Sequence, residues 1–291
     1  MGAGTPTDGT SHGDKRGLEL VVCVKHVPMV SELPWDPVTG TLQRDLGGGM
    51  MNPACRHALE AALQIREMRG GRITVISMGP PMAKEALMEA VAMGADRCML
   101  ITDPAFAGAD TLATSYTLAR LIELKCRDFD LILCGSATSD SETAQVGPQL
   151  AEELNIPVVA YVSHFAWWGG SLRLKRLSDS FLETLEMDTP GLITVTIQSF
   201  KPRYVPVGGV IDAYNAADIQ IIDAACLDSH RDKIGQRGSA TKILRVYSAS
   251  AKKQNVVMTG SPRKIVEELF ANFEDFIGGA ASKDLKPGKK K

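Results

Sequence analysis

The chain lacks several features that would assign it to a common functional class. Its 291 residues carry 32 basic and 34 acidic side chains, for a formal net charge of −2. Nucleic-acid-binding domains normally have a basic excess. Apolar runs such as 21–24 are only a few residues long, far short of the roughly 20 residues that span a membrane. We therefore expect a soluble globular protein with no nucleic-acid partner and no transmembrane segment.

The cysteine and histidine patterns of metal and disulfide proteins are missing as well. Six cysteines and five histidines are scattered along the chain without a C-x-x-C pair or a zinc-like spacing. No apolar segment near the N terminus resembles a secretory signal. We expect no metal site, reduced thiols and a cytoplasmic location.

Common catalytic motifs are also absent. The chain has no G-x-x-x-x-G-K-[ST], H-E-x-x-H or G-x-S-x-G segment, which disfavours P-loop NTPases, zinc peptidases and α/β-hydrolases. Its triple glycine at 47–49 is followed by Met-Met-Asn, so the last glycine of a G-x-G-x-x-G fingerprint is lacking. The sequence supports no self-contained hydrolase or ligase and assigns no catalytic residue.

What the chain does contain is an alternation of short apolar runs and amphipathic stretches. Predicted strands occupy 18–24, 73–77, 98–102 and 131–134, and predicted helices occupy 53–68, 81–93, 110–125 and 143–154. Strands that are apolar on both faces and alternate with helices are typical of a parallel sheet covered on both sides. We predict an α/β fold with a doubly wound sheet in the order 3-2-1-4-5.

The pattern changes after residue 157. Three short strands at 158–165, 172–177 and 181–186 predict an antiparallel meander, followed by a buried strand at 192–197. Residues 201–242 show no long period and are expected to form loops. A helix is predicted at 262–276, before a lysine-rich tail at 286–291.

These boundaries suggest three parts. They are a disordered extension (1–16), an α/β nucleotide-binding domain (17–225) and a C-terminal arm with its helix (226–291). The arm either packs back on its own domain or reaches another chain, and the residues leave both alternatives open.

The most distinctive candidate site follows from the predicted sheet. An open α/β sheet binds ligands at the carboxyl ends of its strands where the strand order reverses, here between the first and fourth strands. The loop after the fourth strand, 135–147, is rich in hydroxyls and small residues and leads into a helix predicted to start near Thr143. Such a loop can bind phosphate, or it can simply cap its own helix. At this position we weigh the two interpretations equally.

Eight short segments form a recognisable series. They are 22–27 (VCVKHV), 51–55 (MNPAC), 75–80 (VISMGP), 92–97 (AMGADR), 110–114 (DTLAT), 130–135 (DLILCG), 143–148 (TAQVGP) and 202–204 (PRY). In this order they resemble the β subunit of electron-transfer flavoproteins, of the adenine nucleotide α-hydrolase-like superfamily. The resemblance extends from residue 18 to about 220.

The resemblance implies a heterodimer with an α subunit, which the C-terminal arm would contact. The redox-active FAD would lie mainly on the α subunit, and the β subunit would hold AMP or NAD(H). The pair would be an electron carrier rather than a conventional enzyme, with NADH-dependent flavin reduction or bifurcation in some members. The family positions that line the nucleotide correspond to Cys23, Asn52, Pro53, Ala54, Cys55, Met78, Gly135, Ser136, Ala137, Thr138, Ser139, Asp140, Ser141, Glu142, Thr143, Ala144, Gln145 and Val146. We add Lys25 as a candidate contact to phosphate or flavin because it follows the first strand, although it could equally be a solvated lysine at the end of that strand.

At several positions this sequence departs from the family pattern, which limits how far the family's site residues can be assigned to it. The family loop G-[KR]-Q-A-I-D-[GD]-D here reads GSATSDSE, and an acidic residue near the flavin is replaced by Leu177. In the loop that docks dehydrogenases, Val207 stands where leucine is expected and Asp212 where lysine is expected. Charge across an interface governs partner choice, so we expect a partner other than the usual acyl-CoA dehydrogenases. The T-A-Q-V-G-P form resembles anaerobic, often bifurcating members and modestly favours NAD(H) over AMP.

Proteins of a different functional class have a similar sheet and nucleotide crevice, so a second function stays open. A stand-alone adenine-nucleotide-binding regulator of the universal-stress-protein type would have no need of the long C-terminal arm or of a second subunit. Co-purification with an α-type partner would discriminate between the two.

Overall fold

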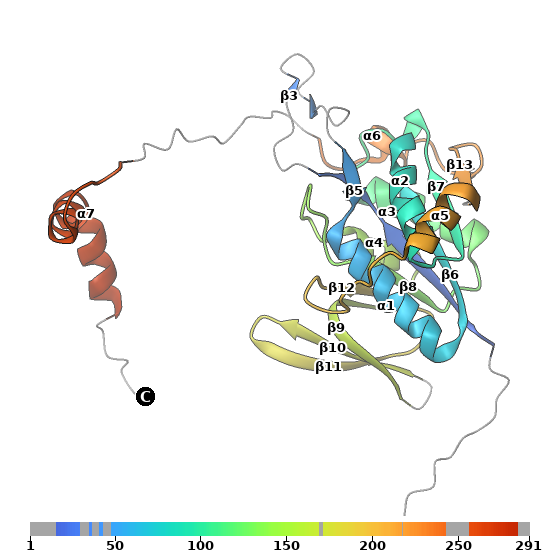
Figure 1. The fold of residues 1–291 in the computed structure, drawn as a ribbon. Helices are drawn as coiled ribbons and strands as arrows, with labels where there is room; N and C mark the ends of the chain where they lie inside the picture. The colour runs from blue at the N-terminus through green and yellow to red at the C-terminus, as the bar shows by residue number, and fades with distance from the viewer. Residues whose placement is uncertain are drawn as a thin grey trace, which may run out of the picture. The chain divides into compact units, whose positions relative to one another are not determined.

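The computed structural model describes residues 16–29, 35–36, 41–42, 48–168, 171–216, 218–242 and 256–284. Most of the predicted N-terminal extension and the whole lysine-rich tail lie outside these residues. The chain divides into two compact units, residues 1–244 and residues 245–291, which are described separately below (Figure 1).

The first unit is built on a nine-stranded sheet with the order β11-β10-β9-β12-β8-β1-β6-β7-β13. Its central strands are β1 (Leu18–Val24), β6 (Gly71–Met78), β7 (Arg97–Ile101), β8 (Leu131–Gly135) and β12 (Gly191–Val195). They pair in parallel in the order β7-β6-β1-β8-β12, which confirms the predicted 3-2-1-4-5 arrangement.

One edge of the sheet is extended by a meander. The meander strands are β9 (Val158–Trp168), β10 (Ser171–Ser178) and β11 (Phe181–Met187). β9 pairs in parallel with β12, whereas β10 pairs antiparallel with both β9 and β11. The predicted antiparallel flank is therefore confirmed.

Helices cover both faces of the sheet. α1 (Pro53–Arg69) and α2 (Lys84–Met93) lie on one face, while α3 (Thr111–Lys125) and α4 (Val146–Glu153) lie on the other (Figure 1). α1 opens with proline in its first turn, where a missing N–H breaks no helical bond. The Asp110 carboxylate caps α3 by accepting from the Ala113 N–H at 3.0 Å. Gly94 ends α2 with a φ of 118°, a conformation that favours glycine.

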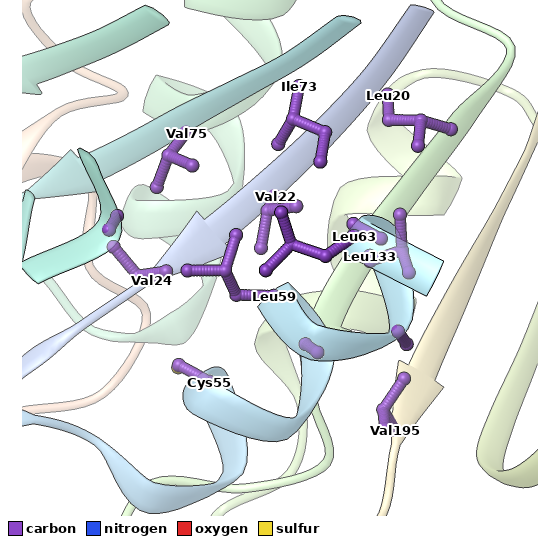
Figure 2. Packing of buried hydrophobic residues seen from close by; sticks show 14 of the residues in the cluster. Leu20, Val22, Val24, Cys55, Leu59, Leu63, Ile73, Val75, Leu133 and Val195 are labelled. Carbon is purple, nitrogen blue, oxygen red and sulfur yellow. The ribbon is translucent and has the colours of Figure 1, made fainter. Parts of the chain in front are cut away.

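Two hydrophobic clusters fill the spaces between these layers. The first joins β1 and β6 to α1 through residues such as Val22, Leu59 and Val75 (Figure 2). The second lies on the opposite face and joins the same strands to α3 and α4 through Val21, Ile76 and others. Consecutive strand residues thus enter opposite clusters, which explains the uninterrupted apolar runs in the sequence.

The stretch 201–242 differs from the loops expected there. It contains α5 (Val207–Ala216), the edge strand β13 (Ile219–Ile222) and the short α6 (Gly235–Gly238). β13 pairs in parallel with β7. A Cβ on Gly209 would lie 2.3 Å from the Ala92 carbonyl oxygen, so this glycine lets α5 pack closely on α2. Neither contact leaves a periodic signal in a stretch this short.

Short elements complete the first unit. They are β2 (His26–Pro28), β3 (Trp35–Asp36), β4 (Thr41–Leu42), β5 (Gly49–Met51) and the 3-10 turns η2 (Pro81–Ala83) and η3 (Pro104–Phe106). β2 pairs with β5, and β3 pairs with β4. The β2–β5 pair brings the chain from the end of β1 back to the start of α1.

The second unit contains the helix α7 (Pro262–Asp284), which extends past the predicted end at residue 276 and has a non-helical residue at Phe273. Its apolar side chains Val266, Leu269, Phe270 and Phe273 are 40–52% exposed. Among the described residues, no helix has the length and apolarity needed to cross a membrane.

Candidate functional site

The predicted site falls at the edge of the sheet where β1 and β8 end side by side. Cys23 of β1 is in register with Cys134 of β8, so the loops that follow these two strands emerge at the same edge of the sheet. The backbone N–H of Asn52, just before α1, donates to the Lys25 carbonyl at 2.8 Å. The start of α1 is therefore held against the end of β1, as the predicted site requires.

Asn52 connects this corner to the loop after β8. Its side chain is buried, with 1% of the residue exposed. Nδ2 donates to the Ala137 carbonyl at 2.9 Å and to the Cys55 sulfur at 3.3 Å. Oδ1 accepts from the Ser139 N–H at 3.0 Å. One amide thus fixes two positions of the candidate loop.

Lys25 makes a second connection to the same loop. Its ammonium group lies 2.8 Å from both carboxylate oxygens of Asp140. The lysine side chain is 40% exposed, whereas the aspartate side chain is only 16% exposed. Asn52 is thus buried, whereas Lys25 is partly exposed.

The loop between β8 and α4 folds into a compact turn. The Ser141 and Glu142 N–H groups both donate to the Thr138 carbonyl, at 3.3 and 2.8 Å. The Thr138 and Ser141 hydroxyls lie 2.8 Å apart. Three residues of the loop are thus connected through one carbonyl and one pair of hydroxyls.

The helix after this loop begins later than predicted. Glu142 and Ala144 have φ values of 50° and 55°, which lie outside the right-handed helical region. α4 therefore starts at Val146, and the prediction of a start near Thr143 was wrong. Within the described residues, the Gln145 side chain makes no capping bond at the start of α4. Because Pro148 has no N–H, the N–H groups without a helical partner in this first turn are those of Val146 and Gly147.

Two glycines allow the segments of the site to approach each other. A Cβ on Gly135 would lie 2.7 Å from the Ala54 carbonyl carbon, and one on Gly147 would lie 2.6 Å from the Thr194 methyl group. Such distances are too short for any side chain. The first glycine seats β8 against α1, and the second seats α4 against β12.

Three thiols lie at the ends of β1 and β8 and at the start of α1. Cys23, Cys55 and Cys134 are all buried. A hydrogen bond with Cys134, together with burial, raises the pKa of Cys23 well above its usual value. Burial also raises the pKa of Cys55, although a hydrogen bond with Asn52 opposes the change. Cys23 and Cys55 are therefore neutral at physiological pH and are poor nucleophiles.

The structure brings most of the predicted residues to one edge of the sheet. Cys23, Lys25, 52–55 and 135–146 all lie at the ends of β1 and β8 or at the start of α1, and Met78 ends the neighbouring strand β6. Val207 and Asp212 are elsewhere, on α5.

Sequence reasoning missed two threonines beside this site. The Thr111 hydroxyl donates to the Gln145 side-chain oxygen at 3.1 Å. The Thr194 hydroxyl accepts from the Tyr161 N–H at 2.9 Å, beside Gly147. The position of Thr194 at the end of a buried strand was the only available signal.

Arg203 in the PRY segment has a structural role within this chain. Its guanidinium lies 2.8 Å from one Glu60 carboxylate oxygen and 3.1 Å from the other, and 2.7 Å from Glu67. Glu60 is buried on α1 with a side-chain exposure of 5%. Burial alone would raise the pKa of Glu60, but hydrogen bonds from Arg203 and Gln64 outweigh burial and lower it.

Comparison with known proteins now identifies the family. A family model described as "Electron transfer flavoprotein domain" matches residues 39–226. The chain belongs to the electron transfer flavoprotein family. This finding confirms the resemblance that the eight sequence segments indicate.

Individual relatives narrow the assignment to the β-subunit branch of that family. The electron transfer flavoprotein subunit beta of Thermoanaerobacterium thermosaccharolyticum is 40% identical over 252 residues, which cover 87% of this chain and 96% of the relative. Subunit CarD of the caffeyl-CoA reductase-Etf complex of Acetobacterium woodii is 40% identical over 84% of this chain and 93% of its own length. Protein FixA of Azorhizobium caulinodans is 36% identical over 87% of this chain and 94% of its own length.

Proposed function

We propose that this chain is the β-type half of a heterodimeric electron carrier and holds an adenine nucleotide in the crevice between β1 and β8. Together with an α-type subunit it would pass electrons through FAD, from a dehydrogenase to a downstream acceptor. The observation that carries the nucleotide proposal is the preformed loop 135–146, tied to the start of α1 and leading to an uncapped helix.

The residues of the crevice fit an adenine nucleotide. Lys25 supplies a positive charge if a ligand phosphate displaces Asp140 from it, the start of α4 supplies the N–H groups of Val146 and Gly147, and the Thr138 and Ser141 hydroxyls supply further polar contacts. Small residues at Gly135 and Ala137 let a ligand approach the backbone. This combination suits a phosphate group and an attached ribose.

In this proposal the chain binds and orients cofactors, and it needs no acid, base or nucleophile of its own. FAD, when bound in the heterodimer, supplies the redox chemistry. The raised pKa values of Cys23 and Cys55 fit this role, because neutral buried thiols do not attack a bound cofactor.

NAD(H) is the nucleotide that we favour over AMP. The segment 143–148 has the T-A-Q-V-G-P form. The family resemblance implies that Ala144 stands where plain carriers tend to have a larger asparagine. A smaller residue beside the phosphate leaves room for a dinucleotide. A relative whose name places it in a caffeyl-CoA reductase complex is consistent with an anaerobic type of carrier.

Two surfaces are suited to protein partners. We assign the exposed apolar side chains of α7 to the α-type subunit, since a helix with such a face normally packs against another surface. We assign α5, with Val207 78% exposed and the acidic Asp212 beside its apolar side chains, to the redox partner. The reversed charge at residue 212 argues for a partner other than the usual acyl-CoA dehydrogenases.

Co-expression with an α-type subunit tests the proposal. We expect a stable one-to-one complex that is yellow and has a flavin absorption spectrum. A flavin-free monomer that binds ATP would instead support the stand-alone regulator and overturn the carrier. Separate purification of each chain provides the control for non-specific association.

A further inference from the structure

Asn52 is the most completely engaged polar side chain in the crevice. Both amide hydrogens take part in contacts, one with Ala137 and one with Cys55, and its oxygen accepts from Ser139. Its backbone N–H donates to Lys25, and its carbonyl accepts from the N–H groups of Cys55 and Arg56. A residue committed in this way is poorly placed to offer an amide to a base or ribose.

The direction of these bonds is unusual for the position of Asn52. It stands at the N-cap of α1, where an asparagine side chain normally accepts from its own helix. Within the described residues, that capping bond is not formed. The side chain instead crosses to a loop more than 80 residues later in the sequence, with separations of 85 and 87 residues to Ala137 and Ser139. The Asn52 side chain therefore does not cap α1, and its hydrogen bonds instead hold the backbone of the loop at Ala137 and Ser139.

We propose that Asn52 is a positioning residue, which holds the 137–139 backbone in its nucleotide-binding shape before the nucleotide arrives. This inference rests on the proposed nucleotide function and replaces the expectation that Asn52 contacts the nucleotide directly. Its consequence is preorganisation: a ligand that meets an ordered loop does not spend binding energy on ordering it.

The expected effect follows from the population of the ordered loop. If Asn52→Ala lowers the ordered fraction to about a tenth or less, the apparent Kd rises about tenfold or more. Asn52→Asp keeps an oxygen that can accept from Ser139, but it places a second oxygen opposite the Ala137 carbonyl. It should therefore keep the Ser139 amide protected while still weakening nucleotide binding.

The chain offers a matched control at the opposite end of the sheet. The Asp96 carboxylate accepts from the Ile73 N–H at 2.8 Å and from Arg66 at 2.9 Å. Like Asn52, Asp96 holds a backbone segment that is distant in the sequence. Asp96 does so at the beginning of β6, whereas Asn52 lies near the end of β1. Asp96→Ala should speed exchange at Ile73 and leave nucleotide affinity unchanged.

The test compares the full chain in complex with its α-type subunit, as wild type, Asn52→Ala, Asn52→Asp and Asp96→Ala. Site-resolved amide hydrogen exchange is measured without added nucleotide, and AMP and NADH are then titrated separately. We expect faster exchange at Ser139 in Asn52→Ala and a Kd at least about tenfold higher in both Asn52 variants.

The outcomes separate the inference from the function on which it rests. Weaker binding by Asn52→Ala with unchanged Ser139 exchange would indicate direct contact and overturn the positioning role. Unchanged affinity in the Asn52 variants would overturn it too. If Asn52→Ala does not fold, Asn52→Asp carries the same test, and wild-type affinity in that variant overturns the inference. A wild-type complex that binds neither AMP nor NADH would overturn the nucleotide function itself.

Discussion

The crevice corner, which comprises Lys25, Asn52 and the loop 135–146, differs from the surface of α5 in how its side chains are paired. At the corner, Asn52, Lys25 and the loop after β8 are connected by hydrogen bonds and an ion pair over long sequence separations. On α5 and just before it, apolar side chains are directed to solvent, with Tyr204 93% exposed and Tyr214 79% exposed. One region is internally satisfied, and the other has an apolar surface suited to a contact.

Three of the segments that resemble the family have structural roles in this chain. Arg203 of PRY pairs with Glu60, Asp96 of AMGADR holds β6, and Gly147 of TAQVGP seats α4. All three maintain the scaffold. The departures to which we assign partner choice, Val207 and Asp212, lie on α5. Changes in the first group should therefore alter stability, while changes in the second should alter association.

The largest stability effect is expected for Arg203→Ala. It leaves the Glu60 carboxylate buried without its main partner, and removing one member of a buried ion pair costs about 3 kcal/mol. Urea denaturation measures the loss. Glu67→Ala is the matched control, because Glu67 is 54% exposed and its pairing with Arg203 should contribute less than about 1 kcal/mol. Equal losses in the two variants would contradict this account.

The same pair predicts a pH dependence. The pKa of Glu60 is lowered in the folded state, so the folded protein binds a proton less readily at this site than the unfolded chain does. The stability from this carboxylate is present above its unfolded pKa and is lost as the pH falls through the folded value. The wild type should therefore lose more stability than Arg203→Ala on acidification below the usual glutamate pKa. Parallel pH profiles of the two would contradict the prediction.

A smaller loss is expected for Gly147→Ala, because the new methyl group would lie 2.6 Å from the Thr194 methyl group. Overpacking of this kind costs about 1–3 kcal/mol. Thr194→Ser removes the opposing methyl group but keeps the hydroxyl that accepts from Tyr161. The double variant should recover most of the loss in thermal denaturation. Additive losses would show that this contact does not determine the cost.

A still smaller stability effect is expected for Val207→Ser on α5. This side chain is 78% exposed, and exposed substitutions usually change stability by less than about 0.5 kcal/mol. Electron transfer to or from the redox partner should nevertheless slow, which stopped-flow absorbance of the flavin can measure. A large loss of stability with normal transfer would reverse the comparison between α5 and the crevice corner.

Asp212→Lys changes the charge of the same surface without adding apolar area. It should leave stability unchanged, slow association with the native partner and speed association with an acyl-CoA dehydrogenase. Rates that stay the same for both partners would remove Asp212 from the docking surface.

The sequence predicted the central architecture because its signals were local. Buried strands such as 18–24 and the Asp110 cap needed only neighbouring residues to be recognised. The start of α4 was misplaced because positive φ values at Glu142 and Ala144 leave no residue-type signature. β13 and α5 were missed because they are specified by pairing with β7 and packing on α2.

The sequence predicted which residues lie together at this edge of the sheet, but not the bonds between them. The predicted sheet order placed the ends of β1 and β8 side by side, and the hydroxyl-rich residues drew attention to the loop after β8. The bonds from Asn52 to Ala137 and Ser139 depend on three-dimensional proximity across 85 and 87 residues. No pattern in the sequence separates such a positioning amide from one that contacts a ligand.

The central claim is that the crevice between β1 and β8 holds an adenine nucleotide in the working complex. The most direct measurement is to denature the purified complex with its α-type subunit and identify the released nucleotides by mass, with their amounts per complex. The account predicts FAD together with AMP or with NAD(H), the latter also exchangeable with added NADH. Release of a single FAD per complex, with no AMP or NAD(H) and no binding of added AMP or NADH, would contradict it.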